Sequence, residues 1–362
     1  MPDYSKVEMQ TGPINAPVQK DDSSSSLMVE TLESGLSQLR NQPVHITELQ
    51  REVCPFVSSF LAEHLRILLD TGESVPVFFK DMNPQHQVKT AQIVRGDSMA
   101  PSYHELRVYQ QILARADLGT PQLYAVRWEP DKGIFWFFFE DVGKTRLRDS
   151  RNFQRWVPAA RWAARFHAAT RNLSPSPSFL PVWDLAHYSR LADRIGGILA
   201  ELDAKDRTIV AEALEHYMSR ISWFAALPKT VIHGQFFGKN IMVRGPRGDR
   251  TLTVIDWETA ALGPGSFDLV SISFGKWTEE QRLFMWRTYF EEYQARTALS
   301  LSWKDFCAEF REMEIYQALE WVGWWRNRSV SHNFGKWIKE LTRVMNDRRR
   351  DDFEGDRHAA AR

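Results

Sequence analysis

The alternation of apolar and polar positions divides the chain into a part that favours strands and a part that favours helices. Between about 44 and 140, the runs "LRILLDTG" and "SVPVFFKDM" predict a hairpin, and "PQLYAVRWEP" and "GIFWFFFEDVG" predict two more strands joined by the turn "PDKG". Between these pairs, apolar residues recur at helical spacing over 106–113, and Gly119 and Pro121 end the helix. This part is therefore predicted to be a small sheet with one inserted helix.

Helical periodicity dominates from about residue 150 onward. The exception is 230–256, where "TVIHG", "NIMVR" and "TLTVID" are short apolar runs separated by tight turns. The pattern predicts an α+β fold with a β-rich lobe, a linker near 141–150 and a helical lobe that contains one β-insert. The helices expected in the second lobe cover 153–170, 187–225 and 278–299.

The two ends of the chain lack the apolar periodicity of the middle. Residues 1–43 are polar and include a serine run, so we expect a disordered tail. Residues 346–362 mix charges of both signs without an apolar face, which predicts a charged C-terminal tail. The expected domains are then a β-rich N-lobe at 44–141 and a helical C-lobe at 142–345.

Composition narrows the classes of partner. Lys+Arg and Asp+Glu both number 46, so no global field would attract nucleic acid or an anionic membrane. The N-terminal sequence does not resemble a signal peptide, and no apolar run is long enough to span a bilayer. The two cysteines, Cys54 and Cys307, form no CxxC motif, which argues against a disulfide framework or a structural zinc site. We expect a cytoplasmic protein, although two buried thiols are compatible with any compartment.

One stretch carries the clearest chemistry. The sequence "VIHGQFFGKNIMV" at 231–243 is followed by "TVIDWE" at 253–258. Asn240 and Asp256 each lie beside a short strand and offer the amide and carboxylate oxygens that Mg²⁺ prefers. Either residue alone is more simply a turn residue, but the two together in this order predict a metal site.

The motifs "HGQFFGKN", "IDWE" and "GPGSFDL" resemble those of the aminoglycoside phosphotransferase family and its relatives, the choline, homoserine and macrolide kinases. The resemblance covers roughly 44–345 and implies a bilobal protein-kinase-like fold with a small β-rich N-lobe on the nucleotide side. It implies ATP and Mg²⁺ as cofactors and a small-molecule acceptor, with Asn240 and Asp256 holding the metal that bridges the phosphates.

The resemblance also assigns nucleotide-binding residues in the first lobe. Lys80 ends the strand "VPVFFK" and matches the lysine that contacts the α- and β-phosphates, although a snorkelling edge lysine would look the same. Glu105 matches the helix glutamate that pairs with this lysine, although Ser102 and Glu105 also have capping-box spacing. The linker that offers backbone groups to adenine corresponds to Glu140, Asp141 and Val142.

The catalytic loop departs from the family pattern at one position, because Gln235 stands where the family has aspartate. A glutamine amide is not basic, but it can orient a nucleophile by hydrogen bonding. Lys239 resembles a basic residue that reaches the γ-phosphate in tyrosine kinases, or it is a solvent-facing loop lysine. His233 is expected to brace the loop, and Asp268 is either a second brace or an ordinary acid at a helix start.

A glycine-rich phosphate loop is expected near 51–64, but this stretch has no glycine. Backbone amides, or Ser58 and Ser59, are the remaining candidates for phosphate contact. With Gln235, this leaves three hypotheses open. The chain is an ATP-dependent small-molecule phosphotransferase, a pseudokinase that binds a nucleotide or a protein without transfer, or an enzyme that uses the nucleotide differently, for example by slow hydrolysis.

The acceptor and the oligomeric state cannot be inferred from the sequence. The best candidate wall of an acceptor site is 310–337, where acidic residues alternate with aromatic ones, a pattern that suits a cationic substrate. An ordinary amphipathic helix explains the same pattern more simply. The residues concerned are Glu312, Glu314, Glu320, Tyr316 and Trp321.

Overall fold

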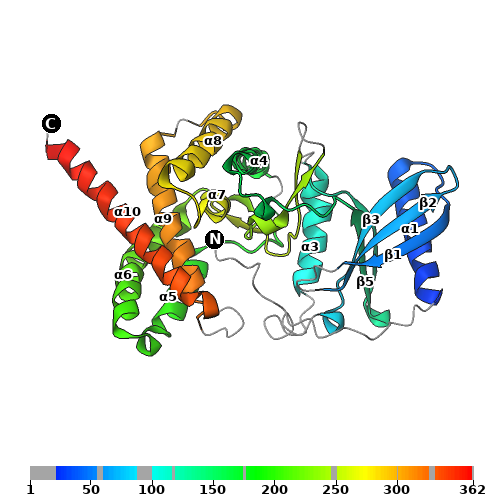
Figure 1. The fold of residues 1–362 in the computed structure, drawn as a ribbon, viewed down its shortest axis with the longest axis horizontal. Coiled ribbons are helices and arrows are strands. Elements are labelled where there is room, and N and C mark those ends of the chain that lie inside the picture. Colours follow the sequence, from blue (N-terminus) through cyan, green and yellow to red (C-terminus); the bar gives the residue numbers. More distant parts are fainter. Residues whose placement is uncertain are drawn as a thin grey trace. The chain divides into compact units, whose positions relative to one another are not determined.

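The chain forms two compact units, one built around a sheet and the other mainly helical, as the α+β prediction requires (Figure 1). The sheet unit takes the described residues up to Thr145 together with Met242–Glu258, and the helical unit takes Arg146–Ile241 and the chain from Thr259 onward. The computed structural model describes residues 22–54, 60–87, 100–115, 119–173, 177–245, 251–299, 301–325 and 331–360.

The core of the first unit is a five-stranded antiparallel sheet in the order β1-β2-β3-β5-β4. Both predicted hairpins are confirmed: Gly72, with a φ of 84°, lies in the turn between β2 and β3, and Gly133, with a φ of 66°, lies between β4 and β5. Only glycine adopts such angles without steric cost. The strands are β1 (Ile46–Val53), β2 (Ala62–Leu69), β3 (Ser74–Asp81), β4 (Leu123–Glu129) and β5 (Ile134–Glu140).

Side chains along β3 and β5 point alternately to the two faces of the sheet, and both faces carry apolar residues. Val77, Phe79 and Phe138 belong to one core cluster, which a helix near the N-terminus covers. The residues between them point to the opposite face, where Phe139 meets Tyr109 of α3 (Ala100–Gln111), with 4.7 Å between ring centroids. Because side chains alternate along a strand, Lys80 must lie on the α3 side, next to the buried Phe79.

The prediction of a disordered tail at 1–43 is wrong for most of its second half. Residues Asp22–Arg40 form a helix, α1, which runs along the sheet (Figure 1). Met28, Leu32 and Leu36 recur every four residues and are almost completely buried against the sheet. Gly35 allows close contact, since a Cβ there would lie 2.3 Å from the carbonyl oxygen of Tyr124. The serine and glutamate residues around this narrow apolar stripe are what made the segment resemble a tail. Residues 1–21 lie outside the described part.

The boundary predicted at 142 also changes, because the hairpin of β7 (Ile241–Arg244) and β8 (Thr251–Val254) belongs with the sheet unit. The Val243 amide donates to the Thr145 carbonyl at 2.9 Å, and Arg244 lies 2.5 Å from the carboxylate of Glu140. These contacts attach the hairpin, and with it Asp256, to the sheet. The "IDWE" motif therefore belongs to the same compact unit as Lys80.

The helical unit contains the predicted stripes, with one break. The helix expected over 187–225 is two helices, because α5 ends at Gly196 and Asp203 caps α6 by accepting from the Asp206 amide. The strand β6 (Thr230–Ile232) pairs with β9 (Ala261–Gly263), which confirms part of the β-insert. The helices are α4 (Val157–Thr170), α5 (Leu185–Gly196), α6 (Ala204–Ala226), α7 (Ser266–Ser273), α8 (Glu279–Thr297), α9 (Trp303–Val322) and α10 (Phe334–Ala360).

The separate charged tail expected at 346–362 is corrected as well, because α10 continues to Ala360. Asp347 lies 2.6 Å from Arg343 and 2.7 Å from Arg350, one turn away on either side. Opposite charges at these spacings stabilise a helix that has little apolar surface. In the described part of the chain no helix is both long and apolar enough to cross a membrane.

Candidate active site

In the sheet unit, Lys80 lies between two carboxylates. Its Nζ donates to Glu105 Oε2 at 2.7 Å and lies 3.4 Å from Asp256 Oδ1. The Glu105 side chain is buried, whereas that of Asp256 retains 23% of its exposure. The alternation of β3, the inserted helix and the "IDWE" motif thus bring three residues chosen from distant parts of the sequence into direct contact.

The structure decides between the two interpretations of Glu105. Helix α3 starts at Ala100, so Ser102 lies inside the helix instead of capping it, and its hydroxyl donates to the Met82 carbonyl at 3.1 Å. The second oxygen of Glu105 accepts from the Trp257 backbone amide at 3.3 Å. Glu105 therefore joins β3 to the "IDWE" motif and does not form a capping box.

The electrostatics of this cluster favour a permanent cation. Burial by itself would lower the pKa of Lys80, but the charges of Glu105, Asp256 and Glu258 outweigh it and raise the pKa above its ordinary value. Burial and the two nearer carboxylates also raise the pKa of Tyr109, which stays neutral. The ammonium of Lys80 is consequently charged at any physiological pH and held in one place, as a phosphate ligand must be.

Asp256 has an unusual backbone for a residue other than glycine. Its φ is 71°, in the left-handed region, where asparagine and aspartate are tolerated better than other side chains. Such conformations concentrate at functional sites, because the surrounding structure has to maintain them. The adjacent Trp257 is fully buried and its indole donates to the Val254 carbonyl at 3.2 Å, which anchors the turn.

The predicted linker segment follows the last strand of the sheet. Glu140 ends β5 and is paired with Arg244, while Asp141 lies 2.7 Å from His64 Nδ1 and accepts from the Gly143 amide at 2.9 Å. Both side chains are occupied in holding the segment. The backbone amides of Glu140 and Asp141 also donate, to the carbonyls of Gln122 at 2.8 Å and Pro76 at 3.4 Å. The adenine contact predicted for Glu140 to Val142 stays a prediction. The candidates for phosphate contact, Ser58 and Ser59, lie outside the described residues.

In the helical unit, one carboxylate organises the predicted catalytic loop. Asp268, in the first turn of α7, accepts from the backbone amides of His233 at 2.6 Å and Gly234 at 3.0 Å. Gly234 has a φ of 78°, and a Cβ there would lie 2.5 Å from the Thr259 carbonyl oxygen. Asp268 is thus a brace of the loop, and the glycine of "HG" is required by both angle and space.

A second brace was missed at the sequence level. His167 of α4 is completely buried, with Nε2 3.1 Å from Asp268 Oδ2 and Nδ1 2.9 Å from the Tyr289 hydroxyl. In the sequence it is one histidine on the apolar face of a helix, which is usually an ordinary core residue. The predicted His233 is also buried, and its Nδ1 accepts from the Gln235 amide at 3.2 Å.

The loop presents Asn240 in a defined orientation. Its Nδ2 donates to the Gln235 carbonyl at 3.1 Å, and the residue is 4% exposed. Because the amide nitrogen is engaged, the amide oxygen is the atom available to a cation, and this suits Mg²⁺. The structure describes no cluster of three or more His, Cys, Asp and Glu side chains that could hold a metal alone. Mg²⁺ in kinases needs fewer protein ligands, since phosphates and water supply the rest.

Gln235 and Lys239 are both partly exposed on this loop. Within the described residues, the side-chain amide of Gln235 has no hydrogen-bond partner and Lys239 has no carboxylate within ion-pair distance. Between them, Gly238 packs so tightly that a Cβ would lie 2.3 Å from Trp156 Cη2. The backbone of the loop is therefore held by close packing at Gly234 and Gly238. The side chains of Gln235 and Lys239 remain available to a ligand.

Most of the acidic residues expected to line an acceptor site at 310–337 form ion pairs within the helical unit. Glu314 is fully buried and lies 3.1 Å from Arg311 and 2.9 Å from Arg343. Glu312 lies 2.7 Å from His216 Nε2. These two acids therefore hold helices together and do not form a free anionic surface.

Glu320 differs from its neighbours in having no ion pair among the described residues. It accepts from Gln317 Nε2 at 3.0 Å, and burial raises its pKa to about 7. Tyr316 is buried beside it, whereas Trp321 lies near the catalytic loop, with 6.3 Å between its ring centroid and that of Phe237. Of the predicted wall, only the Trp321 end adjoins the candidate site.

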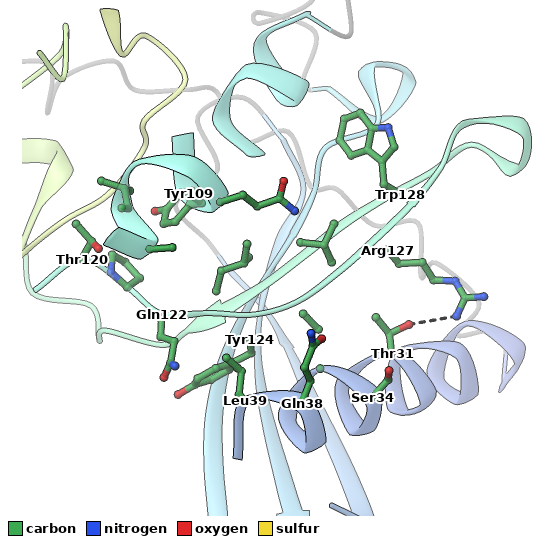
Figure 2. Close-up of a pocket in the computed structure, with 18 of the residues that line it drawn as sticks. Thr31, Ser34, Gln38, Leu39, Tyr109, Thr120, Gln122, Tyr124, Arg127 and Trp128 are labelled. Atoms are coloured by element: carbon green, nitrogen blue, oxygen red, sulfur yellow. Dashed lines mark hydrogen bonds between the residues drawn. The ribbon is translucent and has the colours of Figure 1, made fainter. Parts of the chain in front are cut away.

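A separate pocket of about 1300 Å³ lies in the sheet unit, between α1, the end of α3 and the edge strand β4 (Figure 2). Gln38, Gln122, Tyr124 and Trp128 are among its lining residues. It contains none of the residues to which the motifs assign chemistry. We therefore place the candidate site at the two motif clusters and not at this pocket.

Comparison with known proteins confirms the resemblance to phosphotransferases. The sequence model of the phosphotransferase enzyme family matches residues 62–302. An N-acetylmuramate/N-acetylglucosamine kinase of Neisseria meningitidis serogroup B (strain ATCC BAA-335 / MC58) is 31% identical over 163 residues, which cover 41% of this chain and 44% of that kinase. The chain therefore matches less than half the length of that relative.

Solved structures show the same fold at low identity. The microcompartment-associated aminopropanol kinase has a TM-score of 0.56 and 15% identity, over 82% of this chain and 90% of that one. The GDP complex of wild-type aminoglycoside 2'-phosphotransferase-IIIa has a TM-score of 0.53 and 14% identity, over 92% of this chain and 100% of that one. The predicted kinase-like α+β fold is confirmed.

Proposed function

The chain belongs to the phosphotransferase enzyme family, and on this premise we propose that it transfers the terminal phosphoryl group of ATP to a hydroxyl or amine of a small molecule. The observation that carries the proposal is the contact set of Lys80, whose ammonium lies 2.7 Å from Glu105 and 3.4 Å from Asp256. A charged, immobilised lysine beside a partly exposed carboxylate suits a nucleotide bound with a metal.

The chain's own groups would divide the work as follows. Lys80 binds phosphate oxygens, and Glu105 keeps the lysine oriented. Mg²⁺, when bound with the nucleotide, supplies positive charge to the phosphates, and Asn240 and Asp256 are the residues that would hold it. Lys239 would add positive charge near the transferred group. The structural role of His233 is to keep the loop in place together with Asp268 and His167.

Gln235 would orient the acceptor by hydrogen bonding, but it cannot take up the acceptor's proton. Positioning and charge neutralisation dominate phosphoryl transfer, so a slow or substrate-assisted reaction remains possible without a protein base. The proton would pass to water or to a basic group of the acceptor itself. The relatives' names make amino sugars and amino alcohols the first acceptors to test.

A second function is favoured by the same residue. If the missing carboxylate cannot be compensated, the chain would bind a nucleotide without transferring it. The two candidates differ in turnover and agree in binding. GDP in the related phosphotransferase structure also makes GTP a donor to test beside ATP.

The test combines binding and turnover. Calorimetry would measure ATP and GTP affinity with and without Mg²⁺, for the wild type and for Asp256→Asn, and product analysis would follow with the acceptor panel. We expect Mg²⁺-dependent binding that Asp256→Asn weakens at least about tenfold, together with a phosphorylated acceptor. Binding without any phosphorylated product favours the second function. No binding of either nucleotide at about millimolar concentration overturns both.

A further inference from the structure

A positively charged cluster lies beside the catalytic loop. The loop at Gly238 is in contact with the segment before α4, since a Cβ on this glycine would lie 2.3 Å from Trp156 Cη2 and 3.1 Å from the Arg148 amide nitrogen. Trp156 is fully buried, and its indole donates to the Ser150 carbonyl at 3.0 Å. Trp156 therefore connects the catalytic loop with the groups that pack against its ring.

What packs there is the ammonium of Lys276, from the segment between α7 and α8. Its Nζ lies 4.3 Å from the Trp156 ring centroid and 4.5 Å from that of Trp277. The two indole rings are 5.3 Å apart and nearly perpendicular, at 70°. Two aromatic faces hold the cation by its charge without neutralising it, because a ring quadrupole carries no net charge.

The carboxylates on neighbouring residues have other partners: Glu340 accepts from the Gly275 amide at 3.2 Å and pairs with Arg343, and Asp149 lies 3.6 Å from Arg148. Neither Lys276 nor Arg151 makes an ion pair with a carboxylate in the part of the chain that the structure describes. Partial burial, followed by the like charge of Arg151, lowers the pKa of Lys276. Elsewhere in the same unit, buried cations are paired; Arg311, for example, lies 2.7 Å from Glu279. An anion would offset the repulsion at this one place.

The acids of α9 around Trp321 are engaged within the helical unit, and Glu320 among them accepts from Gln317 Nε2 at 3.0 Å. Trp321 lies against Phe237 and, with 4.5 Å between ring centroids, against Phe274. The nearby acids Glu312 and Glu314 are held in internal pairs. The charges described beside Trp156 are therefore positive, which favours an anionic acceptor group over the cationic one suggested by the sequence.

Resting on the proposed phosphotransfer, we infer that the acceptor carries an anionic group, a carboxylate or a phosphate, that binds Lys276 and Arg151 beside the catalytic loop. Lys276, fixed between Trp156 and Trp277, would supply a directional charge-assisted hydrogen bond. Arg151 can add a bidentate one. These residues select the acceptor by charge, whereas Lys80 and Asp256 serve the nucleotide.

The test uses a pair of sugars that differ in one carboxylate. Calorimetry on the full chain would compare N-acetylmuramate, which is anionic, with N-acetylglucosamine, which is neutral, and would include inorganic phosphate as a minimal anion. We expect the anionic sugar to bind the wild type about tenfold more tightly than the neutral one, as one or two charge-assisted hydrogen bonds predict. Lys276→Met and Arg151→Gln should each remove most of this preference.

Two controls make the result specific. Lys304→Met removes an exposed lysine elsewhere in the same unit and should keep the wild-type preference. ATP affinity should be unchanged in Lys276→Met and Arg151→Gln, which separates an acceptor site from a site for the donor phosphates.

Three results overturn the inference: equal binding of the two sugars, no binding of either anion at about 10 mM, or a preference that both variants retain. Loss of ATP binding in Lys276→Met with unchanged sugar binding overturns it too. The proposed function fails separately, by absence of Mg²⁺-dependent nucleotide binding in the wild type.

Discussion

Gln235 is the residue at which chemistry and family pattern diverge, and a single substitution tests its meaning. Gln235→Asp supplies a carboxylate that can accept the acceptor's proton, and a general base typically contributes about 10²–10⁴-fold. Because the rest of the loop is held by Asp268 and Gly234, we expect faster transfer at unchanged nucleotide affinity. The measurement is the initial rate of phosphorylated product with saturating ATP and Mg²⁺.

Gln235→Asn is the matched control, because asparagine has the shape of aspartate and no basic oxygen. It should not exceed the wild-type rate. If aspartate and asparagine behave alike, the position has no role in proton transfer, and the non-transferring interpretation gains weight.

Lys80 depends on Glu105 for its orientation, and this can be separated from its charge. In Glu105→Gln the amide keeps the size of the side chain but loses the charge that lies 2.7 Å from Nζ. We expect ATP affinity to fall about tenfold and the transfer rate at saturating ATP to fall as well. The reason is that the misplaced ammonium no longer contacts the phosphates. Titration calorimetry and initial rates check this, with exposed Lys132→Met as a control that should bind like the wild type.

The pairing of Lys80 with Glu105 could be predicted from the sequence because both residues occupy fixed steps of regular elements. A lysine after Phe79 on an alternating strand must face the helix side, and Glu105 lies in the first turns of that helix. His167 could not be predicted in this way. Its role depends on Asp268 and Tyr289, both of which are about a hundred residues or more away in sequence.

At the level of elements, α1 shows how a short apolar stripe determines structure. Leu32 is completely buried in the sheet core, and Leu39 on the same helix is 45% exposed. We expect Leu32→Ala to reduce the free energy of unfolding by about 2–5 kcal/mol. Leu39→Ala should change it by less than about 0.5 kcal/mol. Urea titration followed by circular dichroism measures both, and equal effects would mean that α1 does not pack on the sheet.

The hairpins were predictable because their information is local, with alternating apolar residues and glycine turns next to each other. The helix α1 was not, since only three apolar residues in 19 face the sheet and the surrounding serines are typical of disordered segments. Its stability comes from strands that follow it in the chain. The break between α5 and α6 was missed for a different reason, because continuous helical periodicity concealed the cap at Asp203.

Glu320 on α9 gives the helical unit a pH-dependent stability. Burial raises its pKa to about 7 in the folded chain, from an ordinary value of 4.5. A carboxyl whose pKa is raised on folding stabilises most below its unfolded pKa, and this contribution is lost as the pH rises toward about 7. We expect Glu320→Gln to raise the free energy of unfolding by about 1–3 kcal/mol relative to the wild type at about pH 8. At about pH 4 the difference should be small. Thermal unfolding at both pH values measures it, and a pH-independent difference would contradict the assignment.

At the scale of the whole molecule, ligand binding should stabilise the folded chain through the two proposed metal ligands, Asp256 and Asn240. A ligand that binds only the folded chain stabilises it by about 2.7 kcal/mol at a hundred times its dissociation constant. We expect Mg-ATP to raise the Tm by several degrees, more than ATP without Mg²⁺ does. Asp256→Asn and Asn240→Ala should each remove the Mg²⁺-dependent part. Differential scanning calorimetry checks this, with Lys304→Met as a control.

A Mg²⁺ effect that survives either substitution would remove that residue from the metal site. If Asn240→Ala alone has no effect, the nucleotide is bound by the sheet unit, and the catalytic loop does not take part in holding the metal.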